Sequence, residues 1–324
     1  MPSEFNIIQQ YFTRPSPQAD LGVGDDAALT RVADGMQLAI SSDMLVAGTH
    51  FLHICAPYDI GWKALAVNVS DMAAMGAQPK WATLAIALPP ALANDAVWLS
   101  AFSEGFFACA DAFNIDLIGG DTTRGPLNIS VTIMGEVPIG KALRRDGAQV
   151  GDDIWVSGTL GDAALALAVM QNRSQIHEKW PEDELEKWLQ RLHKPQPRAM
   201  LGLALRGIAS SCIDISDGLL ADLGHILKAS NCGAEIRLEQ LPVSLYHFNH
   251  LHEPIIQQCV LAGGDDYELC FTAPSNARSL IEALGKQQNL LLSCVGSTRM
   301  AIGLQVMYQN KSLTLLKQGF DHFG

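Results

Sequence analysis

Six short motifs place aspartate beside glycine or serine, and most of them follow an apolar segment. Short acidic side chains on such turns can converge on a cation, because glycine lets the backbone approach closely. Mg²⁺ prefers oxygen ligands in near-octahedral geometry and usually shares them with substrate phosphates. The motifs are Gly24-Asp25-Asp26, Ser41-Ser42-Asp43, Asn68-Val69-Ser70-Asp71, Gly119-Gly120-Asp121, Asp214-Ile215-Ser216-Asp217 and Gly263-Gly264-Asp265-Asp266.

Turn formation and helix capping also favour aspartate and glycine, and for any single motif that explanation is the better one. Six such motifs, at the ends of apolar strands, favour a metal cluster instead.

The motifs of common kinases are absent from the sequence. There is no G-x-x-x-x-G-K-[ST] phosphate loop and no kinase-type glycine-rich loop with its lysine. Few basic residues stand near the aspartate motifs, namely Lys63, Arg124, Arg144 and Arg145. A bound triphosphate is therefore expected to be held mainly by metal ions, with one or two arginines assisting.

The charge balance constrains the partners. The net charge of −12 argues against nucleic acid, whose phosphates select basic surfaces. Residues 1–138 carry 14 acidic and 5 basic side chains. A nucleotide bound there would need cations between the carboxylates and its phosphates.

The cysteines and the N-terminus predict a cytoplasmic protein with no membrane partner. Seven scattered cysteines with no C-x-x-C pair indicate reduced thiols. Residues 1–13 lack the basic start and apolar run of a secretory signal. The longest apolar stretch, residues 81–93, is broken by Pro89-Pro90 and is too short to span a bilayer.

The histidines carry little information by themselves. His50, beside Phe51, is more simply explained as structural. His247, His250 and His252 are close in sequence, but without a cysteine partner a transition-metal site is disfavoured and their role stays open.

Helical and extended patterns mix along the whole chain, which predicts an α/β or α+β class. A polar, glycine-containing stretch at 138–151 marks a junction between an N-terminal domain, 1–138, and a C-terminal domain, 148–324. Strands are expected at 37–40, 81–88, 116–118, 128–136, 153–157, 212–215, 234–238, 267–271 and 291–295. Helices are expected at 59–75, 95–113 (capped by Asn94 or Asp95), 161–170, 197–208 and 218–230, and the charged run 178–186 is expected to be a solvated helix face.

The motifs resemble those of the thiamine-monophosphate kinases, within the aminoimidazole ribonucleotide synthetase-like superfamily. The resemblance runs from about residue 20 to the end through GVGDDAAL, AISSDMLVAGTHF, DIGWKALAVNVSDMAAMGA, LIGGDTTRG, GDDIWVSGTLGDAA, IDISDGLLADLGHI, GGDDYEL and GFDHF. It implies a two-domain fold whose N-terminal sheet pairs across a homodimer and whose C-terminal domain is an α/β sandwich.

The resemblance also implies roles for individual residues. Asp26, Ser41, Asp43, Asp71, Asp121, Asp214 and Asp217 would ligate several Mg²⁺ ions, with Ser42 joining through its backbone. Gly120, Asp121, Arg145 and Ser216 would contact ATP. His50, Glu268 and Phe320 would face thiamine monophosphate; the last position is often Trp in the family and is Phe here.

The implied reaction is in-line transfer of the γ-phosphoryl group of ATP to thiamine monophosphate, the last step of thiamine diphosphate biosynthesis. A phosphate monoester has a second pKa of about 6, so it is already mostly doubly ionised at neutral pH. It needs no strong general base, and no catalytic residue is assigned. Divalent ions would relieve the repulsion between the two polyanions.

Two alternatives remain at this stage. The first is another ATP-dependent member of the superfamily. Selenophosphate synthetase would want a reactive cysteine near the N-terminus, whereas the first here is Cys55, and aminoimidazole ribonucleotide synthetase would lack the His50-Phe51 and 59–77 patterns. The second is a non-catalytic metal or nucleotide sensor, which the intact aspartates at every motif oppose.

Overall fold

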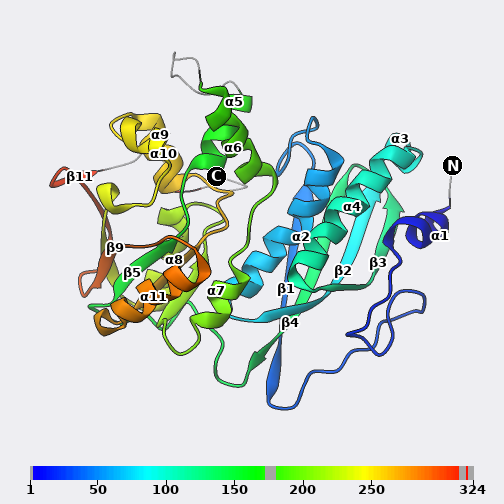
Figure 1. Ribbon diagram of the computed structural model, residues 1–324, viewed down its shortest axis with the longest axis horizontal. Helices are drawn as coiled ribbons and strands as arrows, with labels where there is room; N and C mark the ends of the chain where they lie inside the picture. Colours follow the sequence, from blue (N-terminus) through cyan, green and yellow to red (C-terminus); the bar gives the residue numbers. More distant parts are fainter. Residues whose placement is uncertain (1–2, 172–179, 314–318, 320–324) are drawn as a thin grey trace. The chain divides into compact units, whose positions relative to one another are not determined.

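The computed structural model describes residues 3–171, 180–313 and 319. The chain divides into two compact units. The first comprises Met1–Met72 and Ala77–Gly140, and the second comprises Ala73–Gly76 and Lys141–Gly324. Each unit has its own sheet with helices packed on it (Figure 1).

The sheet of the first unit has four strands in the order β1-β4-β2-β3. They are β1 (Met36–Val46), β4 (Asn128–Pro138), β2 (Gln78–Leu88) and β3 (Asp116–Arg124). Neighbouring strands are antiparallel except β2 and β3, which are parallel. Strand β1 is therefore one edge of the sheet and β3 the other.

Two long helices, α2 (Pro57–Ala74) and α4 (Ala96–Phe113), lie together on one face of this sheet (Figure 1). The two helices approach so closely at Gly105 of α4 that a Cβ atom there would stand 1.9 Å from the carbonyl oxygen of Tyr58 on α2. Only glycine therefore fits at this contact. The predicted cap of α4 is confirmed: the Asp95 side chain accepts hydrogen bonds from two backbone N–H groups of the first turn. The remaining helical segments of this unit are α1 (Glu4–Ile7), the π-helical η1 (Ile8–Phe12) and α3 (Pro90–Ala93).

The two faces of β1 differ. Ser41 lies opposite Ile133 and Asp43 opposite Val131, two buried residues of β4, so these polar residues share the helix-covered face. The alternate residues point the other way. Leu38, Ile40 and Met44 are 40%, 62% and 54% exposed, so this face presents apolar side chains that the described residues leave open.

The second unit has a seven-stranded sheet in the order β11-β10-β7-β9-β5-β8-β6. Its core joins this sheet to the flanking helices through buried aliphatic residues such as Val156, Leu223 and Ile236. The strands are β5 (Asp153–Ser157), β6 (Ser211–Asp214), β7 (Gly233–Arg237), β8 (Leu269–Ala273), β9 (Leu292–Arg299), β10 (Gly303–Tyr308) and β11 (Lys311–Leu313). The helices are α5 (Asp162–Met170), α6 (Glu182–His193), α7 (Ala199–Ala204), α8 (Leu219–Ala229), α9 (Leu245–His250), α10 (Pro254–Ala262) and α11 (Arg278–Gln288), with 3₁₀ turns η2 (Leu238–Gln240) and η3 (Ser275–Ala277).

Several expected boundaries were wrong. The strand expected at 37–40 continues to Val46, and the one expected at 116–118 continues to Arg124, so Asp43 and Asp121 lie within strands and not at their ends. Both strands are extended by pairing with their neighbours. Strand β1 pairs with β4 over its whole length, and β3 continues to pair with β2 after one irregularity in the register. The strand expected from 267 begins at Leu269 instead.

The start of β8 is delayed by an unusual turn. Asp265 and Tyr267 have φ angles of 70° and 49°, which a β-ladder cannot accommodate. In addition, the run 178–186 proved to contain the start of α6, while its first two residues lie outside the described part of the chain. The elements without a predicted counterpart include α9, α10, α11, β10 and β11.

Among the described residues, no helix is both long enough and apolar enough to cross a bilayer.

Candidate active site

Strand β1 and helix α2 bring the first group of predicted residues together. The Ser41 hydroxyl donates a short hydrogen bond to Oδ2 of Asp71. The backbone N–H of Asp43 donates to Oδ1 of Asn68 at 3.1 Å. Asn68 and Asp71 are three residues apart on α2 and so share one face of the helix. The strand and the helix thus position Ser41, Asp43 and Asp71 side by side.

The donor chemistry of this group fits a hard divalent cation. Its side chains offer hydroxyl, carboxylate and amide oxygens, which are the ligands that Mg²⁺ prefers. Within the ranges that the structure describes, no three His, Cys, Asp or Glu side chains are gathered as a ready-made metal site. Mg²⁺ sites are commonly built from one or two carboxylates with waters and substrate phosphates.

A second group lines a cavity of about 610 Å³ in the first unit. Asp25 and Asp26 reach it from the loop before β1, and Gly120 and Asp121 from β3. Gly120 has φ of 151°, and a Cβ atom there would stand 1.9 Å from the carbonyl oxygen of Leu84. Only glycine fits this position, so the cavity wall at Gly120 is bare backbone that a ligand can approach closely.

Asp121 points away from the helices. The next residue, Thr122, is buried on the helix-covered side of β3, whereas Asp121 is exposed. Ser42 also lies on the open side of its strand, where its hydroxyl donates to the carbonyl of Val131 and stands 3.1 Å from the hydroxyl of Thr132. The Ser42 side chain therefore hydrogen-bonds to β4.

His50 lies in a tight turn directly after β1. Its Nδ1 accepts a hydrogen bond from the backbone N–H of Val46 at 3.0 Å. Because Nδ1 is an acceptor, the neutral ring carries its proton on Nε2. The buried Lys63 on α2 lies 3.4 Å from the His50 carbonyl oxygen and supports the same turn.

In the second unit, the predicted residues Asp214, Ser216 and Asp217 occupy the end of β6 and the turn that leads into α8. The strand expected at 212–215 spans Ser211–Asp214, so Asp214 is its last residue, and its side chain is buried. The turn is held from one side by the carboxylate of Asp222, whose Oδ2 accepts the N–H groups of Ser216, Asp217 and Gly218 at 3.0–3.1 Å.

The other side of this turn is held by the segment before β8. The Asp265 N–H donates to the Ser216 carbonyl at 2.9 Å, and the Tyr267 N–H donates to the Ile215 carbonyl at 2.8 Å. Asp265 and Tyr267 both have left-handed backbone conformations. Strained residues of this kind persist only where surrounding structure holds them, and they cluster at functional sites.

Arg145 lies in the same unit and is fixed through its backbone. The hydroxyl of Ser230, at the end of α8, donates to the Arg145 carbonyl at 2.9 Å and accepts the N–H of Ala148 at 3.1 Å. The neighbouring Arg144 pairs with Asp146, with Nε 2.8 Å from Oδ1. The two adjacent arginines therefore differ: the Arg144 side chain forms a local ion pair, whereas Arg145 is held through its backbone carbonyl.

Glu268 is fully buried in the second unit. Its Oε2 accepts hydrogen bonds from the Ser157 hydroxyl and from Nε of Arg198, both at 2.6 Å, and Arg191 donates to Oε1 at 2.6 Å. The carboxylate is therefore surrounded by side chains of its own unit. The expectation that Glu268 faces the acceptor stays a prediction.

Phe320 lies outside the described residues. The preceding residue, Gly319, is described, and a Cβ atom on it would stand 2.5 Å from Cβ of Ala221 and 3.3 Å from the Asp217 carbonyl oxygen. The chain therefore passes directly beside the turn that carries Asp217.

Among the three histidines whose role was left open, burial accounts for His247. His247 is fully buried, with Nδ1 2.6 Å from the Ser244 hydroxyl and 3.3 Å from Asp162. Burial lowers the pKa of His247 despite the opposing effect of Asp162. The cysteines are all thiols, as predicted, and burial raises the pKa of Cys259 to about 12.

Sequence reasoning missed the residues that act by holding others. Asn68, Asp222 and Ser230 each bind the backbone of a predicted site segment. A signal existed for two of them: Asn68 shares a helix face with Asp71, and Asp222 is an acidic residue in the first turn of a helix. Ser230 carried no such signal.

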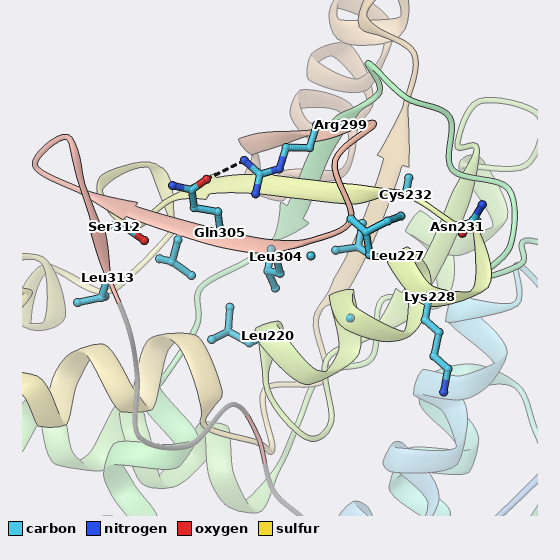
Figure 2. Close-up of a pocket in the computed structure, with 14 residues that line it drawn as sticks. Leu220, Leu227, Lys228, Asn231, Cys232, Arg299, Leu304, Gln305, Ser312 and Leu313 are labelled. Atoms are coloured by element: carbon cyan, nitrogen blue, oxygen red, sulfur yellow. Dashed lines mark hydrogen bonds between the residues drawn. The ribbon is translucent and has the colours of Figure 1, made fainter.

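A larger cavity, of about 800 Å³, lies in the second unit between α8 and β10 (Figure 2). Leu220, Leu227 and Lys228 line it from the helix, and Arg299 and Gln305, which are joined by a 2.7 Å hydrogen bond, line it from the strands. None of the predicted site residues is among the described residues that line this cavity.

Comparison with known proteins identifies the class. Residues 24–137 match the family described as AIR synthase related protein, N-terminal domain, and residues 149–291 match its C-terminal domain. The fold is thus that of the AIR synthase related proteins, as predicted. The chain is also 46% identical over 324 residues to the thiamine-monophosphate kinase of Salmonella typhimurium, covering 99% of this chain and 98% of the relative. The chain belongs to the thiamine-monophosphate kinase family.

Solved structures agree. The crystal structure of thiamine-monophosphate kinase from Stenotrophomonas maltophilia superposes with a TM-score of 0.83 at 47% identity, covering 93% of this chain and 94% of that one. The structure of AaThiL complexed with AMPPCP and TMP superposes with a TM-score of 0.75 at 31% identity, covering 93% and 92% of the two chains. The resemblance drawn from the motifs is confirmed.

Proposed function

We propose that this protein is an ATP-dependent kinase that phosphorylates thiamine monophosphate to thiamine diphosphate. The observation that carries this function is full-length similarity to thiamine-monophosphate kinases, including AaThiL complexed with AMPPCP and TMP. The site supports it, because carboxylates and bare backbone surround a cavity large enough for a nucleotide.

We further propose that the protein binds several Mg²⁺ ions. The proposed ligands are Asp26, Ser41, Asp43, Asp71 and Asp121 in the first unit, with Ser42 contributing its backbone, and Asp214 and Asp217 in the second. Bound metal would neutralise phosphate charge during transfer. The protein's own part is positional: Asn68 fixes the backbone at Asp43, and Asp222 fixes it at Asp217.

The substrates are assigned to a second set of residues, which shares Asp121 with the metal ligands. Gly120, Asp121, Arg145 and Ser216 are proposed to contact ATP, and His50, Glu268 and Phe320 to contact thiamine monophosphate. The Val46 N–H donates to Nδ1 of His50, which places the proton of the neutral ring on Nε2. The phosphate acceptor is already ionised, so no residue is required to remove a proton from it.

The two domains are proposed to contribute different parts of these contacts. Residues 1–138 are proposed to form a metal- and ATP-binding domain that also dimerises. Residues 148–324 are proposed to carry further nucleotide and acceptor contacts. Seven cysteines present as thiols support a reducing, cytoplasmic location.

A homodimer is proposed through the open face and edge of the four-stranded sheet. Leu38, Ile40 and Met44 project from that face of edge strand β1 and are exposed. Edge strands with exposed apolar residues invite pairing with another chain. A second copy of this chain would cover both the edge and the face.

The test is ADP release from ATP and Mg²⁺ against a panel of acceptors: thiamine monophosphate, thiamine, and other phosphate monoesters. We expect turnover with thiamine monophosphate and formation of thiamine diphosphate in equal amount to ADP. Turnover with a different phosphorylated acceptor, and none with thiamine monophosphate, would refute the assignment. ATP binding without turnover on any acceptor would favour the sensor alternative.

A further inference from the structure

One of the six aspartate motifs, Gly263-Gly264-Asp265-Asp266, has no place among the proposed metal and substrate contacts. It connects α10 to β8. Asp266 is 3% exposed, and its two carboxylate oxygens share the backbone N–H of Gly161, at 3.0 and 3.1 Å. This carboxylate therefore binds a backbone group of its own unit, which is a different role from that of a metal ligand.

The chain from this motif to β8 lies along the turn that leads into α8. Three backbone hydrogen bonds join the two. The Asp265 N–H donates to the Ser216 carbonyl at 2.9 Å, the Tyr267 N–H donates to the Ile215 carbonyl at 2.8 Å, and the Ile215 N–H donates to the Glu268 carbonyl at 2.8 Å. They continue the pairing of β6 with β8 past the ends of both strands. The carbonyl groups of the turn are thus held on this side.

The closest approach between the two is at Gly264. A Cβ atom there would stand 2.4 Å from the Ser216 carbonyl oxygen. Gly264 does not have a positive φ angle, so the limit on its side chain is set by this contact and not by the backbone conformation. Any side chain at Gly264 would therefore press on the residue that is proposed to contact ATP.

The same segment is anchored on the start of α5. Gly161, whose N–H is bound by Asp266, is the N-cap residue of this helix. A Cβ atom on Gly263 would stand 2.3 Å from Cβ of Ala164 in the first turn. The segment 263–267 is therefore in contact with α5 on one side and with the turn before α8 on the other.

Resting on the proposed function, we propose that segment 263–267 positions the turn of Ser216 and Asp217 for ATP and metal, and that Asp266 is the positioning residue that fixes this segment on α5. The left-handed backbone at Asp265 and Tyr267 agrees with this role, because strained residues persist only where the surrounding structure holds them. This motif would then serve the site by setting the position of another motif's backbone.

Gly264→Ala tests the contact between the segment and the turn. Ordinary van der Waals contact begins at about 3.4 Å, so the added methyl group must separate the segment from the Ser216 carbonyl by about 1 Å. Misplacement by this distance can cost up to about 100-fold in rate. We expect Gly264→Ala to weaken Mg²⁺-dependent calorimetric binding of a non-hydrolysable ATP analogue, and to raise the KM for ATP, by about tenfold or more.

Gly224→Ala is the matched control for this substitution. Gly224 lies within α8, and a Cβ atom there would meet no atom within 4 Å. We expect this variant to bind the analogue like wild type. The KM for thiamine monophosphate should change little in either variant, because neither glycine lies among the proposed acceptor contacts.

Asp266→Ala and Asp266→Asn test the anchor. Alanine leaves the Gly161 N–H without its acceptor, whereas asparagine keeps one oxygen for it. We expect Asp266→Ala to weaken analogue binding about tenfold and Asp266→Asn to retain most of it. Asp152→Ala is the control, because Asp152 is also a buried carboxylate that accepts a backbone N–H, from Gln149 at 2.9 Å. This control should lower only the melting temperature.

The outcomes separate this inference from the proposed function. Binding is measured well below the melting temperature of each variant, so that a loss of stability alone does not weaken it. If wild type does not bind the analogue with Mg²⁺, the proposed function itself fails. If wild type binds it, but Gly264→Ala behaves like Gly224→Ala or Asp266→Ala like Asp152→Ala, segment 263–267 does not position the turn.

Two further results would overturn the inference. A rise confined to the KM for thiamine monophosphate would assign the segment to the acceptor, through Glu268. Equal impairment of Asp266→Asn and Asp266→Ala would show that the charge of Asp266 matters and not its bond to Gly161. The substitutions at Gly264 and Asp266 act at different points, so either one decides the question if the other variant does not fold.

Discussion

Arg198 binds both carboxylate oxygens of Glu268: Nε lies 2.6 Å from Oε2, and the terminal nitrogen bonds Oε1. Arg191 adds a third charged hydrogen bond, and Glu268 itself is fully buried. Two arginines therefore depend on one carboxylate, whatever further role that carboxylate has towards the acceptor.

Glu268→Gln should consequently destabilise the protein. Removing one partner from a buried ion pair typically costs about 3–5 kcal/mol, because the other charge stays buried without compensation. We expect a marked fall in the melting temperature, measured by calorimetry, alongside any rise in the KM for thiamine monophosphate. Glu282→Gln, on α11 of the same unit, is the control. An unchanged melting temperature would contradict the ion-pair interpretation.

Asp71→Asn should abolish turnover while leaving the melting temperature unchanged or slightly raised. Asp71 belongs to a set of carboxylates proposed to bind metal, and neutralising one relieves their mutual repulsion in metal-free protein. Asp111→Asn, on the neighbouring helix α4, should leave turnover intact. Wild-type activity of Asp71→Asn at ordinary Mg²⁺ would refute the metal cluster.

Ile40→Glu should convert the proposed dimer to a monomer. Ile40 is 62% exposed on the open face of β1, and a charge there would be buried at the interface. Sedimentation velocity at micromolar concentration measures the change. Val97→Glu, an exposed apolar position on α4, is the matched control and should remain dimeric. A wild-type protein that sediments as a monomer would contradict the proposal directly.

The pair of Lys80 and Glu136 predicts a pH effect on stability. Burial would raise the pKa of Glu136, but hydrogen bonds from Lys80, at 2.7 Å, and from the Ala33 N–H, at 2.8 Å, hold it below its usual value. A lowered folded-state pKa stabilises the protein above the unfolded value of about 4.3. This contribution is lost as the pH falls through the folded-state pKa.

Glu136→Gln should therefore flatten the dependence of unfolding free energy on pH below about pH 5 relative to wild type. Urea unfolding at a series of pH values measures it. Asp20→Asn, which removes an exposed carboxylate paired with Arg31, should leave the slope close to that of wild type. Identical slopes for wild type and Glu136→Gln would show that the pair does not contribute.

Local signals in the sequence predicted local structure well. The Asp95 cap follows from side-chain chemistry, and β5 occupies the residues where an apolar run predicted it. Asp43 and Asp121 were placed at strand ends because polar residues interrupt the apolar pattern. Pairing with β4 and β2 carries both strands past them, and such pairing is set by distant residues.

The surroundings of the site residues were less predictable for the same reason. Glu268 is enclosed by Arg198 and Arg191, which are 70 and 77 residues away in sequence, so its burial had no local signature. Asp222 acts through backbone N–H groups whose convergence depends on the turn. Motif resemblance predicts which residues touch ligands, whereas the residues that hold these in place became apparent only from the three-dimensional structure.

Strand β1 presents two different sets of side chains, on opposite faces, at a spacing of one residue. Ser41 and Asp43 project towards α2, and the alternate positions Ile40 and Met44 project outward. Inserting or deleting a single residue within β1 would exchange the two sets, turning the polar groups to the open face and the apolar ones towards α2. A change in the length of β1 is thus expected to disturb the proposed dimer surface and the proposed metal site together, whereas a substitution can alter one of them alone.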